Sequence, residues 1–194
     1  MRPSVLTLIT AAMLAGGTAE AATFSFTTDP FAGTTALTTP GRQIVPPAGS
    51  ELFISFNPAT DEFKFDSLIF GINEPLVFAN GPAASLPTSG AEVIVLQEFG
   101  PPMAAGIAAN LIAARVTSPG PGVFIYFNTG LGVPRLVYST NLDDETADLA
   151  VLARLTNLNA TSLTQFSAGN FDVPEPGALA LFGLTLLAAI RRRS

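Results

Sequence analysis

Clusters of proline and glycine divide the middle of this chain into short segments, and this punctuation limits what it can fold into. Proline cannot donate a hydrogen bond to a sheet ladder, so such clusters mark strand ends and loops. The runs between them are rich in Phe, Val, Ile, Thr and Tyr and alternate with period two, which predicts β-strands. The clusters are Pro46-Pro47, Gly81-Pro82, Gly100-Pro101-Pro102 and Pro119-Gly120-Pro121-Gly122. The predicted strands are Thr23–Thr28, Glu51–Phe56, Glu62–Phe70, Glu92–Phe99, Gly122–Asn128 and Arg135–Thr140.

Two further segments carry helical signals. Met103–Arg115 is Ala-rich and follows Pro101-Pro102, and prolines just before a helix fit its start. Asp143–Leu155 is ambiguous. Its first residues could cap a helix, whereas the apolar residues from Leu149 onward alternate as in a strand. We predict a short capped turn that leads into a strand.

A weak internal repeat suggests how the strands pair. Leu52–Asn57 (LFISFN) parallels Val123–Asn128 (VFIYFN), and after each a turn-rich gap leads to an apolar strand that ends in Ser67 or Ser139. Each unit resembles a β-hairpin, although chance similarity among Phe-rich strands is the alternative. Two such hairpins suggest antiparallel sheets packed as a sandwich. The fold class predicted for residues 22–172 is therefore all-β, an antiparallel β-sandwich-like domain with one short helix.

The N-terminus has the three-part layout of a secretory signal peptide. Arg2 precedes an apolar stretch, Val5–Ala15, and Gly16-Gly17-Thr18 then breaks the helix. Ala19-Glu20-Ala21 is a small-x-small cleavage site, so a signal peptidase would cut after Ala21. A stretch of 11 residues is too short for an ordinary membrane-spanning helix; an N-terminal anchor or a buried helix is the alternative. We assign residues 1–21 to the signal peptide.

The C-terminus combines stiff, apolar and basic segments in that order. Pro174 and Pro176 fix their own backbone and bias Val173 and Glu175 towards extended geometry. The apolar run Gly177–Ile190 has 14 uncharged residues and is followed by Arg191, Arg192 and Arg193. Three arginines are natural at a cytoplasmic membrane surface, and they can snorkel to lengthen a short span. We predict a transmembrane helix over residues 177–190, with residues 1–21 and 173–194 flanking the body.

This tail resembles a PEP-CTERM sorting signal, because Pro174-Glu175-Pro176, the Gly/Leu/Ala-rich run and the terminal arginines coincide. The resemblance covers about the last tenth of the chain. It implies recognition by an exosortase, a membrane-embedded cysteine transpeptidase-like enzyme of Gram-negative bacteria that make exopolysaccharide. It also implies tail removal and delivery from the inner membrane to the cell surface or extracellular matrix. A plain C-terminal anchor without processing is the alternative.

Composition narrows what the body could do. The chain has no Cys, no His and no Trp, so it lacks the usual Ser or Cys triads and any zinc or iron–sulfur site built on those residues. Residues 22–173 contain five basic and thirteen acidic residues, and a net charge of −8 repels nucleic-acid phosphates. Lys64 has no Ser three positions before it, and we expect it to face solvent. We expect no enzyme activity, no cofactor and no nucleic-acid partner.

Two ligand-binding alternatives remain open. The first is a calcium site, for which oxygen ligands are needed, although a solvated capped turn is the simpler interpretation. The second is a carbohydrate-binding module acting on exopolysaccharide, for which Tyr126 and Tyr138 would have to share a face. The leading hypothesis is a non-catalytic surface or matrix protein. The candidate calcium ligands are Asp143, Asp144, Glu145 and Asp148, near Asn141.

Overall fold

The computed structural model describes residues 20–46, 51–73, 75–100, 102–117 and 120–174. The strands are β1 (Thr23–Phe26), β2 (Ile44–Val45), β3 (Leu52–Ile54), β4 (Glu62–Phe65), β5 (Phe78–Gly81), β6 (Val93–Leu96), β7 (Gly122–Asn128), β8 (Val133–Ser139), β9 (Leu149–Leu155) and β10 (Phe171–Asp172). The helices are α1 (Ser67–Phe70), α2 (Ala105–Ala113) and the 3-10 turns η1 (Ala83–Ser85), η2 (Ala160–Gln165) and η3 (Ala168–Asn170).

The larger sheet has seven strands. Six of them follow the order β2-β9-β8-β7-β6-β5, and β3 also pairs with β9. Only the β7–β8 and β8–β9 pairs are antiparallel, whereas every other described pair is parallel. The prediction of antiparallel sheets is therefore wrong for most pairs. Parallel neighbours need crossover connections, and the one from β6 to β7 carries α2, the helix that the sequence predicted.

The two central strands β6 and β7 are buried on both faces, which explains their nearly continuous apolar sequences. Ile94 and Phe124 face α2, where they pack with Ala108 and Ile112. Their neighbours along each strand face the opposite way. Val95 is one of these, and it belongs to a second core cluster that also contains aromatic side chains from the smaller sheet.

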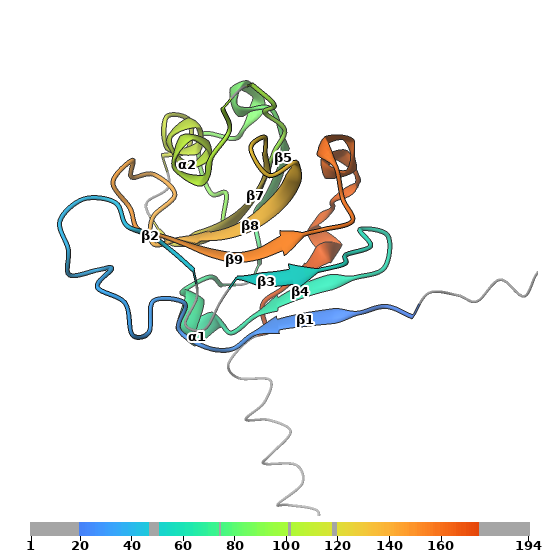
Figure 1. Ribbon diagram of the computed structural model, residues 1–194, viewed down its shortest axis with the longest axis horizontal. Helices are drawn as coiled ribbons and strands as arrows, with labels where there is room; N and C mark the ends of the chain where they lie inside the picture. Colours follow the sequence, from blue (N-terminus) through green and yellow to red (C-terminus); the bar gives the residue numbers. More distant parts are fainter. Residues whose placement is uncertain (1–19, 47–50, 74, 101, 118–119, 175–194) are drawn as a thin grey trace, which may run out of the picture.

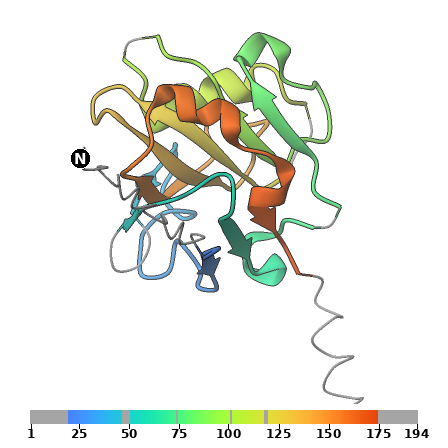
Figure 2. The same cartoon turned by 90° about the vertical axis from the view of Figure 1, so that its right-hand side faces the viewer.

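The smaller sheet has the order β1-β4-β10, and both pairs are parallel. In β4, Phe63 and Phe65 are fully buried, whereas Glu62 and Lys64 alternate with them on the more exposed face. The buried rings pack against side chains of the larger sheet, which lies above β1 and β4 in Figure 1. The structure is thus mostly β, with two sheets of different size sharing one core. In Figure 2 the orange segment carries η2 and η3 from β9 back to β10.

The predicted strand Glu62–Phe70 is only half strand. The Asp66 carboxylate accepts a bond from the Leu68 N–H at 2.9 Å and so caps a helical turn, α1. Gly71 ends that turn in the left-handed region, at φ +65°, a conformation that glycine adopts readily. Local capping therefore ends β4 at Phe65 despite the apolar residues that follow.

The two predicted hairpins have different outcomes. The second unit is a hairpin, with β7 and β8 paired from Gly122↔Ser139 to Asn128↔Val133. The first is not, because β3 pairs with β9 whereas β4 lies in the smaller sheet. The segment from Asp143 forms turns and then β9, as predicted. The short strands β2, β5 and β10 were not predicted.

Candidate functional site

The last strand, β10, holds the beginning of the tail against the body. Phe171 and Asp172 pair with Phe63 and Lys64 of β4. The Lys64 Nζ lies 2.9 Å from a carboxylate oxygen of Asp172, and this bond raises the pKa of Lys64. Both side chains are about 40% exposed, so the pair contributes little stability. Lys64 faces solvent as expected, but it also pairs with Asp172, the residue immediately before the tail.

The next two residues are also attached to the body. Val173 is 1% exposed and belongs to the core shared by the two sheets. The carbonyl oxygen of Pro174 accepts a bond from the Ser67 hydroxyl of α1 at 3.5 Å, so the tail leaves the body beside α1, where the red end of the described chain lies in Figure 2. No spacer separates the folded body from Pro174-Glu175-Pro176. The roles of Val173 and Ser67 could not be predicted from the sequence, because 107 positions separate Ser67 from Pro174.

Most of the predicted processing residues lie outside the described part of the chain. This holds for Glu175, Pro176, the apolar run 177–190 and the basic cluster 191–193, and for residues 1–19 of the signal peptide, including Ala19. Within the described ranges, no helix has the length and apolar character needed to cross a membrane. The predicted transmembrane segment and signal peptide stay predictions.

The predicted signal cleavage site lies at the edge of the folded body. Glu20 and Ala21 are exposed. Among the described residues, Ala22 is the first that bonds to the body: its main-chain nitrogen donates to Asp61 Oδ1 at 3.0 Å, and its carbonyl accepts from the Glu62 N–H at 3.0 Å. The boundary between exposed and attached chain therefore falls between Ala21 and Ala22.

Asp61 is a buried carboxylate that no sequence motif singles out. It is 6% exposed. Oδ1 accepts from Ala22 N and from the Thr60 hydroxyl, and Oδ2 accepts from the Asn57 N–H at 2.8 Å. Burial raises the pKa of Asp61, but the bonds from Ala22, Asn57 and Thr60 outweigh it and lower the pKa. Asp61 is therefore held in its charged form by donors from two separate parts of the chain.

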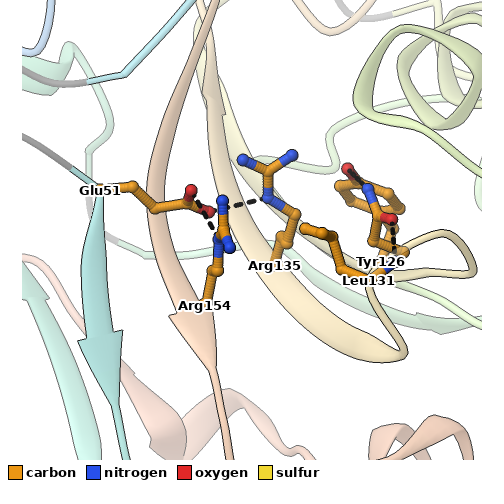
Figure 3. A network of polar contacts seen from close by, with 6 residues as sticks. Glu51, Tyr126, Leu131, Arg135 and Arg154 are labelled. Carbon is orange, nitrogen blue, oxygen red and sulfur yellow. Dashed lines mark hydrogen bonds and ion pairs between the residues drawn. The ribbon is translucent and has the colours of Figure 1, made fainter.

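A second polar group lies on the larger sheet, where Glu51 bridges two arginines (Figure 3). Glu51 Oε1 lies 2.8 Å from Arg135 Nε, and Oε2 lies 2.7 Å from Arg154 Nε. Arg135 and Arg154 are directly paired across β8 and β9, and two like charges there would repel without Glu51 between them. Burial lowers the pKa of Arg135, but its bond to Glu51 and its proximity to Tyr126 raise it overall. Glu51 compensates one of the two arginine charges, and neither of its carboxylate oxygens is left free for chemistry.

The acidic residues between positions 143 and 148 do not converge on one point. Asp148 is buried, and its two carboxylate oxygens accept bonds from the main-chain N–H groups of Leu37 and Gln43, each at 2.6 Å. The exposed Asp144 accepts two bonds from Thr146, which lower its pKa. In the part of the chain that the structure describes, no three acidic side chains gather closely enough to hold a metal ion. The arrangement supports the capped turn over calcium.

The two tyrosines do not form a carbohydrate platform. Tyr126 is fully buried in the cluster beneath α2, whereas Tyr138 is 7% exposed and packs in the core between the sheets. The Tyr138 hydroxyl donates to the Phe70 carbonyl at 3.0 Å, and burial, with a smaller contribution from Asp29, raises its pKa to about 12. The carbohydrate-binding alternative needed Tyr126 and Tyr138 to share an exposed face, but they belong to different core clusters and both are buried.

Comparison with known proteins supports the assignment of the tail. The family model for the PEP-CTERM protein-sorting motif matches residues 172–193. No curated protein and no solved structure matches the chain significantly. The resemblance seen in the sequence is thus confirmed: the chain carries a PEP-CTERM motif, the signal of an exported, cell-surface-directed protein sorted by an exosortase. The motif begins at Asp172 within β10, so its first three residues are those attached to the body.

Proposed function

We propose that this chain is a non-catalytic protein of the cell surface or extracellular matrix, made as a membrane-tethered precursor. A signal peptidase removes residues 1–21, and the apolar run 177–190 then holds the body outside the inner membrane. An exosortase recognises Pro174-Glu175-Pro176 and releases or transfers the body. Arg191–Arg193 stay on the cytoplasmic side, as the positive-inside rule requires.

The observation that carries this proposal is the place of the motif in the fold. Val173 is buried and Pro174 bonds to Ser67, so the recognition tripeptide starts at the first residues outside the core. Two prolines restrict the tripeptide in the free state, which lowers the entropy that is lost when an enzyme clamps it. Glu175 adds one charge for a basic pocket to pair with. A processing enzyme therefore finds the start of the tripeptide, Pro174, at a fixed point beside α1.

The use of buried carboxylates supports a non-catalytic body. Asp61 and Asp148 are the acidic residues among the buried side chains of the described body, and both accept main-chain N–H bonds. A general acid or base needs a free oxygen within reach of substrate, and these oxygens serve turns and strand ends. With His and Cys missing from the whole sequence, a structural or interaction role is the best-supported function.

Replacing the tripeptide tests the sorting claim. Pro174→Ala, Glu175→Ala and Pro176→Ala are combined in a chain with an internal epitope tag, expressed in a host that carries a matching exosortase. We expect the triple variant to be exported normally and to accumulate uncleaved in the inner membrane, because the signal peptide acts independently. Gel mobility and membrane fractionation measure processing.

A matched control removes similar residues from the body. Pro87 and Glu145 are both exposed, and the combined change Pro87→Ala and Glu145→Ala also removes a proline and an acid. This control should be processed like the wild type. Equal release of wild type and tripeptide variant would contradict recognition of Pro174-Glu175-Pro176 and would favour a plain anchor or unspecific proteolysis.

A further inference from the structure

Asp61 is a buried carboxylate whose hydrogen bonds in the described structure come only from neutral donors, a property that it shares with Asp148. Its three bonds come from two main-chain N–H groups and one hydroxyl. The ion pairs found in the described ranges are Lys64–Asp172, Arg135–Glu51 and Arg154–Glu51, and Asp61 belongs to none of them. Burying an unpaired charge is costly. A cation beside Asp61 would therefore stabilise the fold.

Removal of the signal peptide would place a cation beside Asp61. Hydrolysis after Ala21 breaks the bond between the Ala21 carbonyl carbon and the Ala22 nitrogen. Water supplies the hydroxyl group that completes the Ala21 carboxyl group and the proton that the Ala22 nitrogen takes. At neutral pH the new carboxyl releases a proton and the new amine binds one, so Ala22 begins with an α-ammonium group. Its nitrogen lies 3.0 Å from Asp61 Oδ1 in the structure.

We propose that Asp61 is the docking site for the α-ammonium group that signal cleavage creates at Ala22, and that this ion pair locks the first strand into the mature body. The proposal rests on the cleavage proposed above. Before cleavage, the same nitrogen is a neutral amide that donates one hydrogen bond. After cleavage, it carries a full positive charge at the same distance, and charge-assisted bonds are about twice as strong as neutral ones.

The site is built so that the new terminus can use it. Glu20 and Ala21 are exposed, so their loss removes no buried side chain. The Ala22 carbonyl accepts from the Glu62 N–H, and Thr23 is the first residue in register with β4. An ion pair at Ala22 therefore fixes the first residue of β1, a strand that carries Phe26 into the core.

The Asp61 turn also joins the two ends of the body. The Asn170 side chain is 3% exposed, and its Nδ2 donates to the main-chain carbonyls of Pro58 and Asp61 at 2.9 and 2.8 Å. Asn170 ends η3 immediately before β10. The turn thus bonds to the start of β1 through Asp61 and to the start of β10 through Asn170. Locking the N-terminus at Asp61 stabilises the same turn on which the tail-bearing strand depends.

The charges near Ala22 favour the ammonium form. Glu62 follows Asp61, and its side chain accepts a bond from the Thr23 hydroxyl at 2.9 Å. Glu20 is a second acid, but it leaves with the signal peptide. The side chains of Asn57, Thr60 and Asn170, which pack around the turn, are neutral, and Lys64 pairs with Asp172. Asp61 and Glu62 thus lie beside the docked terminus, and Lys64, whose charge also acts on Glu62, is paired with Asp172. We expect the two carboxylates to raise the pKa of the α-amino group in the folded state.

The direction in which stability changes with pH follows from the expected rise in the pKa of the α-amino group. An α-amino group has an unfolded pKa of about 7.7–8.0. If folding raises that pKa, the ion pair contributes its full stability below about pH 7.7 and loses it as the pH rises through the folded value. A shift of one pKa unit corresponds to an about tenfold change in the folding equilibrium constant. For a rise of about one pKa unit, the folding equilibrium constant should fall by about tenfold between pH 7 and pH 9.5.

The test compares exported, signal-cleaved protein with two variants and their combination, all in the same tail-processing state. Asp61→Asn removes the carboxylate. Insertion of Gly between Ala21 and Ala22 keeps the cleavage site but moves the α-amino group one residue away, so that Ala22 again presents a neutral amide to Asp61. Mass spectrometry identifies each N-terminus, and urea unfolding at pH 7 and pH 9.5 measures the folding equilibrium constant.

We expect the wild type to lose about tenfold in that constant at pH 9.5 and each variant to lose much less. The combined variant should show no further loss of pH dependence, because both changes break one ion pair. If Asp61→Asn does not fold, the Gly insertion decides alone, since it leaves Asp61 in place. A mature terminus other than Ala22 would overturn both this site and the proposed cleavage. A terminus at Ala22 with the same pH dependence in wild type and insertion variant would overturn the docking site alone.

Discussion

The segments Leu52–Asn57 and Val123–Asn128 have nearly the same sequence, but the chain takes a different path after each of them. The second runs through β7 to Asn128, whose carbonyl accepts from the Gly132 N–H at 2.8 Å, and Gly132 has φ +71°. A positive φ next to the strand lets the chain turn back as a hairpin. In the first, Asn57 is followed by Pro58, and the Asn57 carbonyl accepts from the Asp61 N–H at 2.8 Å. That turn contains no glycine, and it sends the chain into the other sheet.

The comparison shows that strand pattern and strand partner are decided by different residues. Alternating Phe and Ile predict a strand in both segments, but the residues after Asn decide where the next strand goes. Equivalent positions of the two segments therefore lie in different environments, and substitutions at those positions can measure the difference.

The largest difference is expected between Phe53 and Phe124, the second residue of each segment. Phe124 is fully buried beneath α2, so Phe124→Ala should cost about 3–5 kcal/mol of unfolding free energy. Phe53 is 69% exposed, with the Arg154 guanidinium 5.1 Å from its ring centroid, so Phe53→Ala should cost about 0.5–1 kcal/mol. Urea denaturation measures both. Equal losses would mean that the two segments are equivalent after all.

For the aromatic residue before each Asn, the larger loss of unfolding free energy is expected in the first segment. Phe56 is fully buried and stacks on Phe63 with ring centroids 4.2 Å apart, whereas Phe127 is half-buried at the end of β7. Phe56→Ala should cost about 3–4 kcal/mol, because it opens a cavity between the sheets, and Phe127→Ala about 1–2 kcal/mol. Thermal unfolding of both variants at one pH checks this. A larger loss for Phe127→Ala would contradict the crossing of the first segment between sheets.

The smallest difference in lost unfolding free energy is expected between the two Asn side chains. Asn128 is 8% exposed, accepts from the Leu131 N–H at 2.9 Å and donates to the Tyr126 hydroxyl at 3.0 Å. Asn128→Ala leaves these groups without that partner and should cost about 1–3 kcal/mol. Asn57 is exposed, and its side chain accepts only from the Ala59 N–H among the bonds described, so Asn57→Ala should cost about 0.5 kcal/mol. Amide hydrogen exchange in each turn gives an independent local measure, and equal protection losses in the two turns would argue against this ranking.

Features that depend on neighbouring residues could be predicted from the sequence. Gly122–Asn128 is rich in aromatic and β-branched residues, the helix after Pro101-Pro102 is Ala-rich, and the structure places β7 and α2 there. The strands β2 and β10 have only two residues each, too few to show a period. Parallel pairing joins residues far apart in sequence, so no local pattern reports it.

The candidate site likewise has one part that a local sequence pattern reveals and one part that depends on contacts between distant residues. The sorting motif was recognisable because a processing enzyme reads it as a linear sequence, and the family match at residues 172–193 agrees with that interpretation. The attachment of its first residues was not, because it depends on Ser67 in α1. Likewise, Asp61 is one acid among fifteen in the sequence, and only the fold brings it to Ala22.

The parallel arrangement of β1, β4 and β10 determines how the body responds to mechanical load. Traction applied to the two ends pulls β1 backwards and β10 forwards along β4, so the ladder bonds are sheared together instead of opening one after another. The β1–β4 ladder joins four residue pairs, whereas β10–β4 joins two. The β10–β4 ladder is therefore the weaker of the two. Sufficient tension detaches β10 and draws Val173 out of the core while β1 stays paired with β4.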